Sequence, residues 1–153
     1  MALIEVHKVS KIYNPGRADE MVALDGVSLC VEAGDVAVLT GPSGSGKSSL
    51  LSVMGCMARP TEGRVVVDGQ DVVKLPERFL TDIRRQRFGF VFQQFHLIRE
   101  LTVLENVLLP LYPLQMSVSA MKQRGREILV KLRLDAKISR KIKKLSGGEQ
   151  QRV

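Results

Sequence analysis

The sequence is poor in several residue types, and each shortage excludes a class of protein. Only Cys30 and Cys56 are cysteines among 153 residues, which is too few for a disulfide framework and fits no zinc-site spacing. Tryptophan is absent and aromatic residues make up 5%, so the stacking platforms typical of single-stranded nucleic-acid binding are missing. No apolar run is long enough to span a bilayer. The overall composition, 44% hydrophobic and 25% charged, is that of a globular protein.

The net charge of +7 is unevenly distributed along the chain. Residues 1–77 carry a net charge of −3, and residues 78–153 carry +10. Such asymmetry is typical of an anion-binding face, and also of a chain that lacks a balancing acidic segment. Met1 leads directly into a strand-like pattern, so we expect no secretory signal and two reduced cysteines in a cytoplasmic protein.

The hydrophobic pattern predicts an α/β core followed by a helical part. Alternating apolar and polar residues indicate half-buried strands, and the continuous apolar run at 36–39 is typical of a parallel strand buried on both faces. We therefore predict a nucleotide-binding core over residues 1–92 and a helical subdomain over 93–153. The predicted strands cover 3–13, 21–32, 36–39, 64–67 and 88–92, and the predicted helices cover 47–57, 76–87 and 116–134.

A glycine-rich loop between a predicted strand and a predicted helix carries the clearest chemistry. Its sequence is Gly41-Pro42-Ser43-Gly44-Ser45-Gly46-Lys47-Ser48, followed by Ser49, and it matches the pattern G-x-x-x-x-G-K-[ST]. The glycines let successive backbone N–H groups converge on phosphate oxygens, and the positive end of the next helix points at the same place. Lys47 can reach the β- and γ-phosphates, and Ser48 can offer a hydroxyl to Mg²⁺. The motif predicts nucleoside-triphosphate binding, but kinases, GTPases, helicases and transport ATPases all share it.

A second motif, Leu145-Ser146-Gly147-Gly148-Glu149-Gln150-Gln151-Arg152, separates these classes. Ser146 and Glu149 have the spacing of a capping box, which predicts a helix start. Gly147 and Gly148 leave its first turn bare, so N–H groups, a hydroxyl and the helix dipole favour an anion. The motif resembles the signature of the ATP-binding-cassette (ABC) family. That resemblance implies a P-loop NTPase core with an N-terminal antiparallel β subdomain and a helical subdomain.

The resemblance extends to further positions and implies roles for them. Tyr13 stands where the family places an aromatic side chain that stacks on adenine. Gln93 matches the family's Q-loop glutamine, which contacts Mg²⁺ or the attacking water, so Ser48 and Gln93 would hold Mg²⁺. The stretch from Gly89 to Val107 is similar to the ATPases of lipoprotein-release, macrolide-export and cell-division complexes.

The family resemblance also implies partners. Two ATP-binding domains meet head to tail, so Ser146, Gly147, Gly148 and Glu149 would act in trans on the partner's ATP. Closure of this dimer would do work on transmembrane permease subunits, which places the protein in the cytoplasm on the inner face of the membrane. The transported substrate is not encoded in these residues.

Several family elements have no match in these residues, namely the Walker B aspartate, the catalytic glutamate and the switch histidine. No apolar strand followed by an Asp-Glu pair occurs. We therefore expect a fragment without the C-terminal part of the core sheet, which binds ATP weakly and does not hydrolyse it alone.

Two alternative functions remain open at this stage. A soluble nucleotide kinase is favoured by the phosphate loop, which resembles that of guanylate kinases, and opposed by the signature motif. An ABC-type ATPase of DNA repair is favoured by the basic second half. However, residues 48–145 hold neither heptads nor cysteine clusters, so we expect no nucleic-acid partner.

Overall fold

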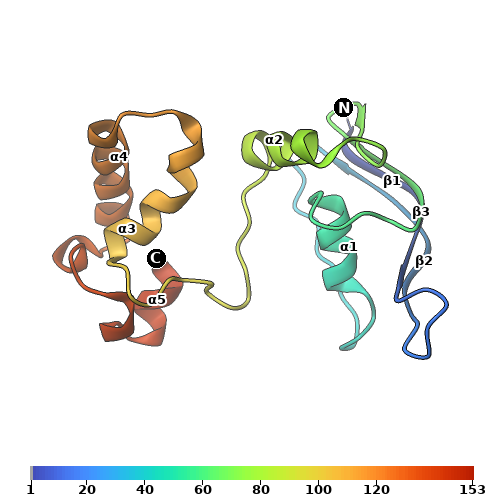
Figure 1. The fold of residues 1–153 in the computed structure, drawn as a ribbon, viewed down its shortest axis with the longest axis horizontal. Helices are drawn as coiled ribbons and strands as arrows, with labels where there is room; N and C mark the ends of the chain where they lie inside the picture. The colour runs from blue at the N-terminus through green and yellow to red at the C-terminus, as the bar shows by residue number, and fades with distance from the viewer. Residues whose placement is uncertain (1) are drawn as a thin grey trace. The chain divides into compact units, whose positions relative to one another are not determined.

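A computed structural model describes residues 2–153 and divides the chain into two compact units, Met1–Gly89 and Phe90–Val153 (Figure 1). The first unit is a four-stranded antiparallel sheet with two helices, and the second consists of short helices.

The sheet of the first unit is built around β1 (Ala2–Tyr13). It pairs antiparallel with β2 (Met21–Glu32) on one side and with β3 (Glu62–Val67) on the other, and the two-residue strand β4 (Gln70–Asp71) completes the order β2-β1-β3-β4. The strands predicted over 3–13, 21–32 and 64–67 are confirmed. Val6 and Val9 both lie in the core although they are three residues apart, because the register of β1 shifts between them and interrupts the alternation of side chains between the two faces.

The two helices of this unit share one core with the sheet. Leu50 and Val53 of α1 (Lys47–Met54) and Leu80 of α2 (Glu77–Arg87) belong to the same buried cluster as Val6 and Val65. Helix α1 ends three residues earlier than predicted, because the chain turns after Gly55 and Cys56 adopts a left-handed conformation with φ 58°.

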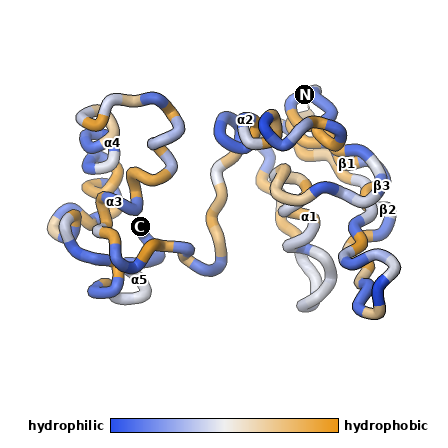
Figure 2. The backbone as a smooth tube through the Cα atoms, in the orientation of Figure 1, coloured by the Kyte–Doolittle hydropathy of each residue, from blue (hydrophilic) through white to orange (hydrophobic). Residues whose placement is uncertain are grey.

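Two predicted strands are wrong. Residues 36–39 and 88–92 are irregular, and the side chains of Val36 and Val38 are 93% and 77% exposed while Val91 is fully exposed. A parallel strand is stable only between neighbouring strands that accept its backbone hydrogen bonds and bury its side chains. Within residues 2–153 neither segment has such a neighbour. Figure 2 shows the stretch between α2 and α3 as largely hydrophobic despite its exposure.

The second unit packs its helices around one small core. Val103, Leu129, Leu134, Ile142 and Leu145 form this core, and Leu129 is completely buried. Its elements are α3 (Val103–Leu108), η1 (Leu109–Leu114), α4 (Val118–Lys131), η2 (Asp135–Lys137), η3 (Ile142–Lys144) and α5 (Gly147–Arg152).

Helix α4 confirms the helix predicted over 116–134, with shorter ends, and only part of its apolar residues are buried. Met121, Gly125 and Leu129 are buried, whereas Val118 and Ile128 are exposed. A Cβ atom on Gly125 would lie 3.0 Å from side-chain atoms of Leu104 and Leu108 of α3. The absence of a side chain there allows α3 and α4 to pack closely. Across residues 2–153, every helix is too short or too polar to cross a membrane.

Truncation of Leu129 tests this small core. Leu129→Ala removes a completely buried side chain and leaves a cavity, so we expect the free energy of unfolding of the second unit to fall by about 2–5 kcal/mol. The matched control is Val130→Ala at the neighbouring exposed position, which should change it by no more than about 0.5 kcal/mol. Urea unfolding followed by circular dichroism measures both, and equal effects would contradict the described core.

Candidate nucleotide-binding site

The phosphate loop owes its shape to glycines in conformations that other residues rarely adopt. Gly41, Gly44 and Gly46 have φ values of 143°, 81° and 86°. A Cβ atom on Gly46 would lie 2.3 Å from the backbone oxygen of Ala23 in β2, which is closer than any side chain permits. A Cβ atom on Gly41 would lie 2.9 Å from Ser45 Oγ. The loop is therefore a compact turn whose end is held against the sheet.

Lys47 folds back over this turn. Its Nζ atom donates hydrogen bonds to the backbone oxygens of Gly41 at 2.9 Å and Pro42 at 2.6 Å, and to Ser45 Oγ at 3.3 Å. The ammonium group is thus held at the mouth of the loop without a carboxylate partner among the ion pairs of residues 2–153. An ammonium group in this position can exchange its carbonyl contacts for phosphate oxygens.

Helix α1 begins immediately after the loop with Gly46 as its N-cap, and its first turn contains no acidic residue. The positive end of the helix is therefore not neutralised locally. Ser43 and Ser48 are exposed, and Ser49 accepts a hydrogen bond from Tyr13 Oη at 3.4 Å. The structure thus brings Tyr13, from the end of β1, next to the phosphate loop.

The residues here fit a nucleoside triphosphate with its metal. Three glycines with positive φ shape the turn, one cation faces it, and the Ser48 hydroxyl offers one hard oxygen ligand. Groups of three or more His, Cys, Asp or Glu side chains that would bind a metal without a nucleotide do not occur in the described residues. The roles of the individual residues stay predictions.

Gln93 lies in the second unit, exposed on the irregular segment before α3. The ring of Phe92 stacks with Phe90 at 6.0 Å between centroids and meets His96 edge-on at 4.8 Å. Gln93 lies in the chain between Phe92 and His96, whose rings are in contact. Its assigned role in holding Mg²⁺ stays a prediction.

The signature segment forms the predicted capping box. Ser146 is the N-cap of α5, and its backbone N–H donates to Glu149 Oε2 at 2.9 Å. Gly147 and Gly148 are exposed, and Cβ atoms built on them would have no neighbour within 4 Å. The first turn is therefore bare, as the sequence predicted.

Glu149 has a partner that the sequence did not reveal. Lys137 Nζ, from η2, donates to Glu149 Oε1. The hydrogen bonds from Lys137 and from the Ser146 backbone lower the pKa of Glu149 to about 2. The carboxylate is thus ionised at all moderate pH values, and the charge of Lys137 balances it.

Sequence reasoning also missed a buried amide that supports the Gln93 segment. Asn106 is the one buried polar residue of the described chain. Its Nδ2 atom donates to the backbone oxygens of Ile98 and Thr102 at 3.1 and 2.9 Å, and its Oδ1 atom accepts from Ile98 N–H at 2.8 Å. No sequence signal distinguishes it from other helical asparagines.

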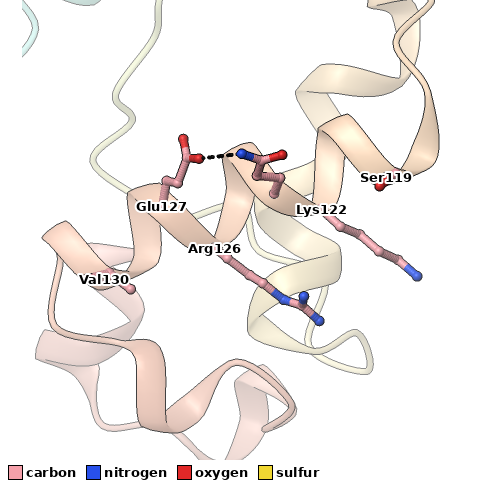
Figure 3. A pocket seen from close by; sticks show the side chains of 6 residues that line it. Ser119, Lys122, Arg126, Glu127 and Val130 are labelled. Atoms are coloured by element: carbon pink, nitrogen blue, oxygen red, sulfur yellow. Dashed lines mark hydrogen bonds between the residues drawn. The ribbon is translucent and has the colours of Figure 1, made fainter.

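The net positive charge belongs to the second unit. Residues 1–89 contain 11 basic and 11 acidic residues, whereas residues 90–153 contain 12 and 5. A shallow hollow on α4 displays part of this charge through Lys122 and Arg126 (Figure 3). Glu127 lies beside them and accepts a hydrogen bond from Gln123 at 3.0 Å. This hollow belongs to the second unit, whereas the phosphate loop belongs to the first.

The loop and its helix, on a β-sheet core, define a P-loop nucleoside-triphosphate-binding fold. Comparison of structures agrees with this class. The dimeric ATP-binding cassette MJ0796, in a post-hydrolysis state bound to ADP and Pi, matches with a TM-score of 0.87 and 42% identity. The match covers 97% of this chain and 66% of the cassette.

Sequence comparison identifies the family. The family model described as ABC transporter matches residues 24–153, and the chain therefore belongs to the ABC transporter family. An uncharacterised ABC transporter ATP-binding protein of Thermotoga maritima and YvrO of Bacillus subtilis are each 41% identical over 151 residues. The macrolide export ATP-binding/permease protein MacB of Hyphomonas neptunium has the same identity over the same length.

Each of these relatives is longer than this chain. The 151 matched residues are 99% of the chain but 64% of the Thermotoga protein, 66% of YvrO and 23% of MacB. The match includes the signature segment as well as the phosphate loop, which argues against the soluble nucleotide kinase.

Replacement of Gly46 tests the attachment of the loop to the sheet. Gly46→Ala forces a side chain against the Ala23 backbone oxygen in a left-handed conformation, so we expect the first unit to lose more than about 2 kcal/mol of stability. Gly44→Ala is the matched control, because Gly44 has a similar φ but open space around it. This substitution should lower the free energy of unfolding by about 1 kcal/mol. Thermal unfolding compares them, and a smaller loss at Gly46 would refute the close contact.

Acid titration tests the Lys137–Glu149 contact. Because folding lowers the pKa of Glu149 from 4.5 to about 2, its carboxylate stabilises the folded unit above pH 4.5, and this contribution disappears as the pH falls toward 2. We expect Glu149→Gln to be less stable than the parent at pH 6, with the difference shrinking below pH 4.5. Lys137→Met should behave similarly. Urea unfolding across this range measures the differences, and a pH-independent gap would contradict the assignment.

Proposed function

We propose that this chain is the ATP-binding part of an ABC transport ATPase and that MgATP binds at the phosphate loop. The observation that carries the proposal is the position of Lys47. Its ammonium group is held over a glycine-shaped turn at the start of α1, where no side chain caps the helix. In this arrangement Lys47 binds the β- and γ-phosphates, and the loop from Gly41 to Ser49 surrounds them. Tyr13 lies against the adenine.

The assignment of Mg²⁺ rests on oxygen ligands. Ser48 would supply a hydroxyl, and the family resemblance assigns an amide oxygen to Gln93. Bound Mg²⁺ would neutralise phosphate charge and orient the phosphates. The contribution of the chain's own residues is to bind and position the triphosphate.

We further propose that the signature segment acts on a second copy. In a head-to-tail dimer, Ser146, Gly147 and Gly148 would face the γ-phosphate of ATP on the partner subunit, with Glu149 capping the helix. Support comes from the bare first turn of α5 and from the dimeric state of the MJ0796 cassette. Such a dimer would sit in the cytoplasm and drive permease subunits in the membrane, in export or lipoprotein release.

Hydrolysis by these 153 residues alone should be negligible. Lys47 and Ser48 provide phosphate and metal contacts, but an apolar strand followed by Asp-Glu, which would hold Mg²⁺ and polarise the attacking water, is not in the sequence. A steady-state Mg-ATPase assay on the purified chain tests this part of the proposal. Turnover equal to that of a full-length relative would overturn it.

Substitution of Lys47 tests the binding site itself. Lys47→Ala removes a charge-assisted contact to phosphate, so we expect the dissociation constant for MgATP to rise at least about tenfold. Lys74→Ala removes an exposed lysine of the same unit. This variant should keep the dissociation constant for MgATP within about twofold of the parent value. Isothermal titration calorimetry measures both variants, with circular dichroism to verify folding. Equal affinities for the Lys47 variant and the parent would refute the site.

A further inference from the structure

A lysine that no motif includes contacts the ring of Tyr13. Lys11 precedes Tyr13 by two positions on β1, and its Nζ atom lies over the ring, 5.0 Å from the centroid. This geometry is that of a cation–π interaction. In residues 2–153 no other ring or cation contacts the Tyr13 ring.

Lys11 is itself held in place from another part of the unit. Its Nζ atom donates to the backbone oxygen of Arg59 at 2.8 Å. The Arg59 guanidinium in turn donates to the backbone oxygens of Val73 at 2.6 Å and Leu75 at 2.5 Å. The ammonium group over Tyr13 is therefore fixed by a chain of hydrogen bonds and does not move freely in solvent.

The other end of the ring is also fixed. Tyr13 Oη donates to Ser49 Oγ at 3.4 Å, and Ser49 follows Ser48 in the first turn of α1. One contact thus sets the distance of the ring from the phosphate loop, while Lys11 covers one of its faces. Only the other face is left as a stacking surface for a base.

The cation also changes the quality of that surface. An aromatic ring carries negative charge on its faces, and a cation on one face draws electron density toward itself. The opposite face becomes less negative and stacks more favourably on an electron-rich purine. Because Lys11 acts through the Tyr13 ring, its contact strengthens the binding of the nucleotide base and leaves the binding of the phosphates unchanged.

We propose that Lys11 is a positioning residue for the nucleotide base, which covers one face of Tyr13 and makes the other a platform for a purine. This inference rests on the proposed function, because it assumes that Tyr13 meets the base of a nucleotide bound at the phosphate loop. Lys11 would thereby favour the binding of nucleoside triphosphates over that of bare polyphosphates.

The test compares two ligands that share phosphates and differ in the base. MgATP and magnesium tripolyphosphate are titrated into the parent chain and into Lys11→Met, Lys11→Gln and Lys11→Arg by calorimetry. Glutamine keeps a donor for the Arg59 oxygen but lacks the charge, and arginine keeps both. Tyr13→Ala reports how much affinity the platform supplies, and circular dichroism confirms that each variant is folded.

We expect Lys11→Met and Lys11→Gln to weaken MgATP binding about three- to fivefold and to leave tripolyphosphate within about twofold. Lys11→Arg should restore MgATP binding to within about twofold of the parent. Tyr13→Ala should lower the affinity for MgATP about tenfold without affecting tripolyphosphate. If Lys11→Met fails to fold, the affinities of Lys11→Gln for MgATP and tripolyphosphate provide the same test.

Other results overturn the proposal in distinguishable ways. Equal weakening of both ligands by loss of the Lys11 charge would show general electrostatic attraction to phosphate, and no weakening of either would show that Lys11 is only structural. Equal affinity of the parent for both ligands would refute the base platform while the phosphate site stands. Binding of neither ligand by the parent would refute the proposed function together with this inference.

Discussion

The close approach of Gly46 to the backbone oxygen of Ala23 is the constraint on which the nucleotide site depends. It joins the end of the phosphate loop to β2, while Leu50 and Val53 bury the following helix in the core of the sheet. The loop therefore has a fixed position relative to β1, which carries Lys11 and Tyr13. The site that we propose for the two ends of a nucleotide would be formed by one small antiparallel sheet and one helix.

The two segments that we propose to bind phosphate are supported in different ways. The phosphate loop rests on buried apolar side chains and on backbone geometry, which respond weakly to salt and pH. The signature segment begins at Leu145, which is buried in the core of the second unit, and the first turn of its helix also depends on the electrostatic contacts between Lys137, Glu149 and Ser146. Salt and pH should therefore affect the first turn of α5 more than they affect the phosphate loop.

The sequence predicted best where structure depends on near neighbours. The strands over 3–13 and 21–32 were predictable because a turn joins them directly and both are rich in apolar residues separated by polar ones, although the register shifts along their pairing were not visible in the sequence. The capping box of Ser146 and Glu149 was predictable because both residues lie within one turn. The strands predicted at 36–39 and 88–92 were wrong, because they require neighbours that the described residues do not supply. The buried face of α4 depends on α3, so the exposure of Val118 and Ile128 was not visible in its periodicity.

By itself the sequence determined the local form of the phosphate loop and of the signature segment, because each motif is a continuous segment whose glycines, lysine and serines act on the backbone nearby. Only the tertiary structure decided which distant residues support them. Tyr13 and Ser49 are 36 positions apart, Lys11 and Arg59 are 48 apart, and Lys137 and Glu149 are 12 apart. Such pairs meet because the packing of strands and helices brings them together, and no local pattern in the chain encodes that packing.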